Sequence, residues 1–183
     1  GTFVPIPRGD VPLGSRIFNY HFVDTPGKSR LTCQDIKAAA EADESRSEEI
    51  VHCPTPRPAT NQIMEYLAVK HDAELLDLDV VSAFIHAAEP EDHVYMRAPR
   101  EWQEETGTFD TVSKLAGNLY GRRPAGTNYR DFFEECLLSV DGGAKRGTLE
   151  PCIFNGGAGT AEWWALSHHI DDGRVVGPGA KKV

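Results

Sequence analysis

The chain has 183 residues, of which 40% are hydrophobic and 26% charged, proportions that are typical of a globular domain. No apolar run approaches the roughly 20 residues of a membrane-spanning helix, and no secretory signal is visible, so we expect an intracellular protein without a membrane partner. The formal net charge of −9 by itself argues against a nucleic-acid-binding protein. A local basic patch would nevertheless be enough for binding, because phosphate contacts are local.

The four cysteines are widely spaced and include no CxxC pair, which argues against a zinc site or a disulfide framework. We expect reduced thiols, with Cys136 and Cys152 in the core.

The first elements predicted along the chain form a β-hairpin. Strands at 17–23 and 29–33 flank Pro26-Gly27, and this pair favours a type II turn. Residues 33–49 are rich in Ala and Glu and fit either a short helix or a loop. Three prolines then follow at 54, 56 and 58, and they end any regular element.

A helix and a buried strand are predicted next. Thr60 is a candidate N-cap of a helix that ends at His71, with one apolar stripe made by Ile63, Met64, Leu67 and Ala68. Residues 74–79 are predicted to form the strand.

The second half of the chain predicts one longer helix and three strands. Pro124 is expected to open a helix that runs to about Val140, with an apolar face made by Phe132, Phe133, Cys136, Leu137 and Val140. Strands are expected at 152–154, 162–170 and 174–176, with Asp171-Asp172-Gly173 as the turn between the last two. The whole predicts an α+β fold.

Two acidic sites have similar settings. Asp79 ends one apolar run, and Asp171-Asp172 lies between two others. Carboxylate oxygens suit Mg²⁺, and a two-metal site stabilises both the attacking and the leaving oxygen of an in-line displacement. Without further context, a surface carboxylate for Asp79 and a hairpin turn for Asp171-Asp172 would be the favoured explanations.

Short motifs supply that context, and they resemble the reverse transcriptase of copia-type retrotransposons. They stand in the order of that family and cover most of the chain, more sparsely between residues 33 and 59. The motifs are Phe3-Val4-Pro5-Ile6-Pro7-Arg8-Gly9, Pro12-Leu13-Gly14-Ser15-Arg16-Ile17-Phe18, Lys28-Ser29-Arg30-Leu31, Leu78-Asp79-Val80-Val81-Ser82-Ala83-Phe84-Ile85-His86-Ala87, Val94-Tyr95-Met96-Arg97-Ala98-Pro99, Lys114-Leu115 with Asn118-Leu119-Tyr120-Gly121, Pro151-Cys152-Ile153-Phe154 and Ile170-Asp171-Asp172.

The resemblance implies a fold, a reaction and partners. The fold would be reverse-transcriptase-like, with fingers in 1–73 and a palm in 74–183, in which helices pack on an antiparallel sheet. The thumb and ribonuclease H parts of the Pol polyprotein would be missing. The reaction would be RNA-directed DNA synthesis from deoxynucleoside triphosphates on an RNA or DNA primer-template, in a cytoplasmic particle or the nucleus. Mg²⁺, or Mn²⁺, would be held by Asp79 and Asp171, with Asp172 as the third catalytic carboxylate.

The resemblance also implies substrate-binding residues. Phe84 would be the aromatic gate against the ribose of the incoming nucleotide, and Lys28 and Arg30 would reach its triphosphate. Residues 113–130 contain no Asp or Glu but include Lys114, Arg122, Arg123 and Arg130, so this stretch is a candidate strand-binding surface with Arg122 and Arg123 among the substrate-binding residues. A core Phe and solvated charges are the structural alternatives.

Two departures from the family pattern motivate a second hypothesis. His169 stands where the family has an aromatic residue, commonly Tyr, and Pro124 stands where it commonly has Gln. An inactive retroelement remnant would explain both. A metal-dependent phosphohydrolase using His71-Asp72 with a distant His and Asp is a further alternative, which a preference for Mn²⁺ bound through imidazole would favour.

Overall fold

The computed structural model describes residues 3–35, 52–89, 94–139 and 144–182, and the fold is α+β. The chain divides into two compact units, each built from two separate stretches: unit 1 from residues 1–51 and 84–129, and unit 2 from residues 52–83 and 130–183. The boundaries of these units differ from 1–73 and 74–183, and the division into fingers and palm stays a prediction. None of the described helices is long and apolar enough to cross a membrane.

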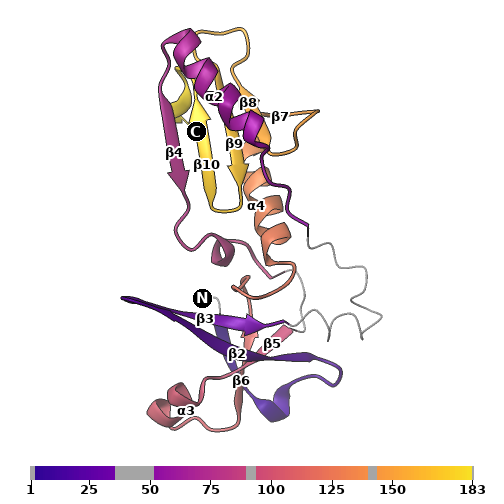
Figure 1. Ribbon diagram of the computed structural model, residues 1–183. Helices are drawn as coiled ribbons and strands as arrows, with labels where there is room; N and C mark the ends of the chain where they lie inside the picture. The colour runs from indigo at the N-terminus through magenta and orange to yellow at the C-terminus, as the bar shows by residue number, and fades with distance from the viewer. Residues whose placement is uncertain (1–2, 36–51, 90–93, 140–143, 183) are drawn as a thin grey trace. The chain divides into compact units, whose positions relative to one another are not determined.

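Unit 1 contains a five-stranded sheet with the order β1-β6-β5-β2-β3 (Figure 1). Its pairs are antiparallel except for β2 and β5, which run parallel. The elements are β1 (Phe3–Pro7), η1 (Arg8–Asp10), β2 (Arg16–Thr25), β3 (Lys28–Gln34), η3 (Ala83–His86), β5 (Val94–Arg97), α3 (Arg100–Thr106) and β6 (Thr111–Leu115).

The predicted hairpin is confirmed as β2 and β3, joined through Pro26-Gly27. Gly27 has a φ of +78°, which is the left-handed conformation that a type II turn requires after Pro. The short helix or loop that was predicted at 33–49 lies mostly outside the described residues. Cys33 is buried in the core of the unit, beside Val94, Met96, Leu115 and Leu119.

Unit 2 contains a second five-stranded sheet, with the order β4-β10-β9-β8-β7 and antiparallel pairs throughout (Figure 1). Its elements are α2 (Pro58–His71), β4 (Leu75–Asp79), β7 (Lys145–Arg146), β8 (Ile153–Gly156), β9 (Trp164–His169), β10 (Asp172–Val176) and η4 (Ala180–Lys182). The helix α4 (Ala125–Ser139) begins in unit 1 and continues into unit 2.

The core of unit 2 lies on one face of this sheet. Leu166 and Val175 are fully buried there in neighbouring strands, and Phe133 and Leu137 of α4 pack against the same cluster. Because strand side chains alternate between faces, Asp77, Asp79, Asp172 and Arg174 project from the opposite face. The helix α2 lies on that second face, where Arg174 reaches its Glu65.

Most of the predicted elements of unit 2 are found, with three corrections. Thr60 is not the cap of α2, because the helix begins at Pro58, and the Thr60 hydroxyl instead donates a hydrogen bond to the Glu150 carboxylate over 3.3 Å. Cys136 is exposed rather than buried. Phe132 is also largely exposed, because Phe133 and Leu137, four residues apart, are the α4 side chains that reach the core.

Candidate functional site

The strand pairing of unit 2 brings the predicted carboxylates to one edge of the sheet. Asp172, the first residue of β10, pairs with Asp79, the last residue of β4. Beyond this pair, the Val80 backbone N–H donates a hydrogen bond of 2.9 Å to the Asp171 carbonyl. Residues that are far apart in the sequence therefore stand side by side, as the resemblance implied.

Asp79 and Asp172 form a like-charge cross-strand pair. Directly opposed residues in an antiparallel pair have Cβ atoms about 5 Å apart on one face of the sheet. Both side chains are exposed, Asp171 is half-buried, and no described Lys, Arg or His forms an ion pair with any of the three. The sheet thus concentrates negative charge at this edge without a described cation to balance it.

The same face continues from this pair into a second row of polar residues. Asp172 also pairs with His169 of β9, while Arg174 pairs with Asp77 on one side and Ser167 on the other. The Arg174 guanidinium donates to the Asp77 carboxylate over 2.8 Å, and this hydrogen bond raises the pKa of Arg174. A second contact of 3.1 Å joins Arg174 to Glu65 of α2. Asp77 is thus neutralised, whereas Asp79 and Asp172 are not.

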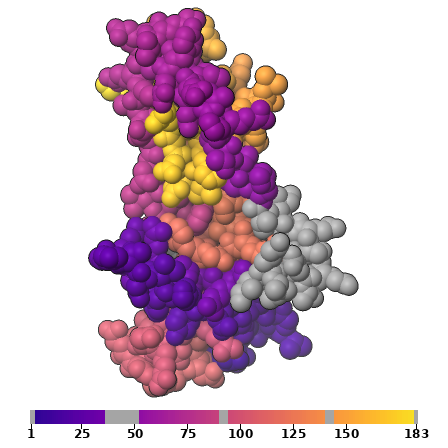
Figure 2. Space-filling view, viewed as in Figure 1, coloured from indigo at the N-terminus to yellow at the C-terminus, as the bar shows by residue number. Residues whose placement is uncertain are grey.

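A groove of about 350 Å³ adjoins this edge within unit 2. Strand residues Asp77, Ser167, His169, Asp172 and Arg174 form one side, and Asn61 of α2 lies on the other. In the space-filling view, the yellow atoms of the C-terminal strands remain visible beside α2, so the helix leaves part of this face open (Figure 2). The carboxylates are therefore accessible to a ligand from solvent.

The turn between β9 and β10 differs from the prediction. Asp172 pairs with His169, so the turn residues are Ile170 and Asp171, and Gly173 lies inside β10. The strand register explains this difference. When Leu166 and Val175 lie opposite each other in the core, the pairing continues to Asp172 and His169, and only two residues remain for the turn. Ile170 takes a φ of +54°, which is rare for a β-branched residue and stores backbone strain at the tip beside the carboxylates.

The neighbouring histidines have different environments. His168 projects into the core face, where its ring stacks on Phe133 with centroids 3.7 Å apart, and burial lowers its pKa to about 4. His169 is half-buried, and its Nδ1 lies 3.1 Å from the Pro54 carbonyl oxygen. His71 packs edge-on against Trp163. These aromatic contacts give His71 and His168 a packing role and do not favour the phosphohydrolase alternative.

The donor set at the sheet edge suits a hard divalent cation, because it consists of carboxylate oxygens. Among the described residues, no group of three or more His, Cys, Asp or Glu side chains is already arranged to hold a metal ion. Binding Mg²⁺ or Mn²⁺ would therefore require the aspartate side chains to rotate toward one another, and exposure leaves Asp79 and Asp172 room to do so. The residues that would hold the ion are Asp79 and Asp171, with Asp172 beside them.

In unit 1, three residues named from the sequence form one stack. The Phe84 ring packs against Tyr120 with centroids 4.8 Å apart, and the Arg30 guanidinium lies over the same Tyr120 ring at 5.1 Å. Phe84 is half-buried, also near Tyr129, and Lys28 is exposed beside the hairpin turn. The prediction that Phe84, Lys28 and Arg30 contact a nucleotide stays a prediction, but Arg30 and Phe84 do share a partner.

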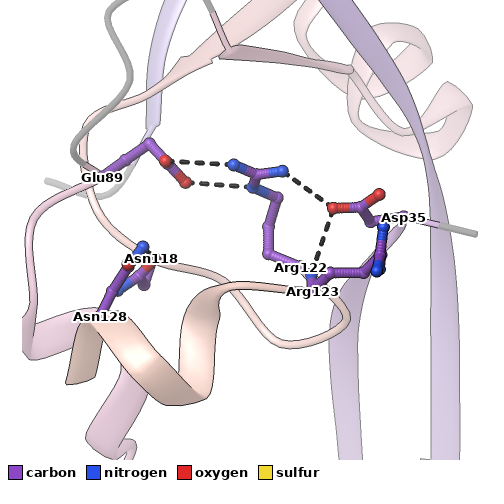
Figure 3. A network of polar contacts seen from close by, with 6 residues as sticks. All are labelled: Asp35, Glu89, Asn118, Arg122, Arg123 and Asn128. Atoms are coloured by element: carbon purple, nitrogen blue, oxygen red, sulfur yellow. Dashed lines mark hydrogen bonds and ion pairs between the residues drawn. The ribbon is translucent and has the colours of Figure 1, made fainter. Parts of the chain in front are cut away.

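Arg122 lies in a buried ion-pair network of unit 1 (Figure 3). Its guanidinium donates to both carboxylate oxygens of Glu89, over 3.1 and 3.2 Å, and to Asp35 over 2.8 Å. The Asp35 carboxylate also accepts the Arg123 backbone N–H over 3.1 Å. All three ion-paired side chains are completely buried. For Arg122 to contact a substrate, these ion pairs would have to open.

The remaining basic residues of the stretch 113–130 are also partly engaged. Arg130 forms an ion pair of 2.6 Å with its neighbour Asp131, and Lys114 and Arg123 are half-buried. Sequence reasoning missed Asp35 and Glu89 as the partners of Arg122. No local signal identifies them, because both pairings depend on contacts between distant segments.

No protein-family model, curated protein or solved structure matches the chain. The geometry described above and the sequence motifs are therefore the basis for a functional assignment.

Proposed function

We propose that the chain is the fingers-and-palm part of an RNA-directed DNA polymerase of a copia-like retrotransposon, with its catalytic carboxylates on the sheet of unit 2. The observation that carries this proposal is the register of β4 and β10. It sets Asp172 opposite Asp79 and joins Asp171 to Val80 through a backbone hydrogen bond. A surface carboxylate and an unrelated turn would have no reason to meet in this way.

The electrostatics of the edge support the same role. Two exposed unit charges 4 Å apart repel by about 1 kcal/mol in water, and by more where the surroundings are less polar. A fold that keeps such a pair without a described counter-charge bears that cost unless a cation binds. Mg²⁺ bound there would supply charge neutralisation for the attacking 3′-oxygen and the leaving pyrophosphate.

The residues of the chain would divide the remaining work. Asp79, Asp171 and Asp172 would hold the cation, and the adjoining groove would accept the end of a primer strand. Arg30 and Lys28 would contact the triphosphate of the incoming deoxynucleotide, and the Phe84 ring would exclude a 2′-hydroxyl. Phe84 is held by Tyr120, which is an observed contact and gives the ring a defined position within unit 1.

A second candidate is a remnant that folds and binds metal but does not extend primers. Pro124 is buried at the start of α4 and has no side-chain donor for a nucleotide. His169 directs its Nδ1 to the Pro54 carbonyl, so this nitrogen is engaged within the protein. Both observations concern the two positions that depart from the family pattern.

The test is primer extension on poly(rA)·oligo(dT) with Mg²⁺ or Mn²⁺. We expect extension by the wild-type chain and a loss of about a hundredfold or more in Asp79→Asn and Asp171→Asn, since each weakens the binding of the cation that would stabilise the transition state. Asp72→Asn is the matched control, because it makes the same change at an exposed carboxylate of unit 2 that does not line the groove.

The outcomes separate the candidates. An Asp79→Asn variant that extends primers at the wild-type rate would overturn the polymerase assignment. No extension by the wild type or any variant, together with Mg²⁺-dependent stabilisation that Asp79→Asn loses and Asp72→Asn retains, would favour the remnant.

A further inference from the structure

A second pocket lies in unit 1 and has a different character from the groove in unit 2. It encloses about 440 Å³, and its lining includes Arg8, Arg97, Arg100, Tyr20 and Phe109, with Asp110 as the described acidic member. The arginines belong to three separate segments: η1, the end of β5 and the start of α3. The sequence alone gives no sign that they meet.

Backbone and side-chain hydrogen bonds fix the walls of this pocket. The Arg8 N–H donates to the Asp110 carbonyl over 3.0 Å, which ties η1 to the segment before β6. The Arg100 N–H donates to the Tyr20 hydroxyl over 3.1 Å, and the Gln103 amide donates to the Ala98 carbonyl over 2.8 Å. The pocket is therefore built by the folded unit rather than by loose side chains.

The charges in the pocket are only partly balanced. Arg100 forms an ion pair of 2.7 Å with Glu104. Arg8 and Arg97 are exposed, and neither forms an ion pair with a carboxylate of the described residues. In a chain of net charge −9, two exposed guanidinium groups in one pocket are a local reversal of sign, which favours an anionic ligand.

An aromatic surface accompanies these charges. Phe109 is 68% exposed, and Tyr20 lines the same pocket. Singly exposed apolar residues are common on protein surfaces. An exposed ring beside two guanidinium groups that pair with no carboxylate of the described residues is a more specific combination, because single-stranded nucleic acids bind through bases stacked on aromatic rings and phosphates held by basic side chains.

We propose that this pocket binds single-stranded nucleic acid, with one base stacked on Phe109 and the adjoining phosphates held by Arg8 and Arg97. The volume lies within the range of about 300–1,000 Å³ that is usual for small-molecule sites. This proposal rests on the proposed function in one respect, namely that nucleic acid is the class of substrate. The pocket belongs to unit 1, whereas the carboxylates belong to unit 2. A base-paired strand presents no free base face, so duplex binds more weakly here.

The experiment measures binding of labelled single-stranded DNA and RNA of about ten nucleotides by fluorescence anisotropy, in EDTA and without nucleotide, at about 50 mM salt. We expect Phe109→Ser and Arg97→Ser each to weaken binding by about fivefold or more, the former through lost stacking. Lys145→Ser is the control, because it removes one exposed positive charge from β7 in unit 2. Circular dichroism and melting verify that each variant is folded.

A second measurement localises the contact. A strand carrying 4-thiouridine, cross-linked by light and analysed by mass spectrometry, should label the peptide that contains Phe109. Equal affinities of wild type and both pocket variants would overturn the proposal, as would an equal loss in Lys145→Ser or cross-links confined to unit 2. Displacement by an acidic peptide, without discrimination between single strand and duplex, would indicate a protein ligand instead.

The two proposals fail separately. Asp79→Asn leaves this pocket intact, so it should bind single strands like the wild type even if it cannot extend a primer. Both proposals would be supported if Phe109→Ser loses binding of single strands while Asp79→Asn retains it, and if Asp79→Asn loses extension fully while Phe109→Ser does not.

Discussion

The two units of this chain treat charge in opposite ways. Unit 1 buries Arg122 completely and surrounds it with Asp35 and Glu89, so that its guanidinium is bonded to both carboxylates. Unit 2 leaves Asp79 and Asp172 exposed and opposite each other on neighbouring strands, with no described cation paired to either.

The difference separates charges that maintain the fold from charges that are available for chemistry. A buried charge must be paired because removing it from water is costly, so the loss of one member of the Arg122 network should destabilise unit 1. An exposed like-charge pair costs little enough to persist, yet it does nothing for stability. A ligand site would require such a pair of carboxylates to be kept at the ends of neighbouring strands, beside a groove.

The largest effect should come from breaking the buried network. Arg122→Met leaves two buried carboxylates without their partner, and we expect a loss of about 3–5 kcal/mol in the free energy of unfolding. Urea denaturation followed by amide hydrogen exchange in unit 1 measures it. Lys28→Met, an exposed change in the same unit, should stay within about 0.5 kcal/mol.

A rescue variant sharpens this prediction. Replacing all three partners, Arg122→Met with Asp35→Leu and Glu89→Leu, removes the charges together and should recover much of the lost stability. If Arg122→Met alone is as stable as the wild type, the network does not contribute to folding, and Arg122 becomes available as a substrate contact.

An intermediate effect should come from pH, through His168 in unit 2. Its pKa is about 4 in the folded chain and about 6.5 when unfolded, so below pH 6.5 the unfolded chain binds the proton first. The contribution of neutral His168 to the free energy of unfolding is complete above about pH 6.5 and is lost as the pH falls toward 4. The loss is about 3 kcal/mol, at 1.36 kcal/mol for each unit by which the two pKa values differ.

Urea denaturation of the wild type and His168→Phe between pH 4 and 7 isolates this contribution. The Phe variant preserves an aromatic ring against Phe133 and should show a smaller slope with pH than the wild type. His21→Phe, at an exposed position in unit 1, should leave the slope unchanged. Identical slopes for wild type and His168→Phe would mean that His168 is accessible to protons in the folded chain.

The smallest effect should come from relieving the like-charge pair. In EDTA, Asp172→Asn should raise the free energy of unfolding by up to about 1 kcal/mol, because it removes one of two opposed carboxylates. Mg²⁺ should raise the melting temperature of the wild type more than that of Asp172→Asn. Asp77→Asn loses a surface ion pair, so it should be neutral or slightly destabilising. A destabilised Asp172→Asn would indicate that this carboxylate has a structural partner.

The sequence was most informative where local chemistry decides the structure. Pro26-Gly27 specifies the β2–β3 turn through the fixed φ of Pro and the positive φ of Gly. Buried apolar runs predicted β4, β8, β9 and β10 to within a few residues, and Pro124 precedes α4. These features depend on neighbours in the sequence and can be predicted from it.

The sequence was least informative where distant segments choose between local options. Ile170 and Asp171 form the turn in place of the predicted residues 171–173, because the pairing of Leu166 with Val175 in the core overrides the Asp-Gly preference. Cys136 fits an apolar helix stripe but faces solvent, because only a narrow face of α4 meets the sheet.

By itself, the sequence determined the α+β class and most strands and helices, because these follow from periodicity and turn chemistry. Motif order also named three carboxylates, whose catalytic role stays a prediction. Only the tertiary structure decided that Asp172 stands opposite Asp79, that Arg122 is sealed between Asp35 and Glu89, and that Arg8 and Arg97 share a pocket with Phe109. Strand register and long-range packing set these contacts, and both minimise free energy over the whole folded unit rather than over any one segment.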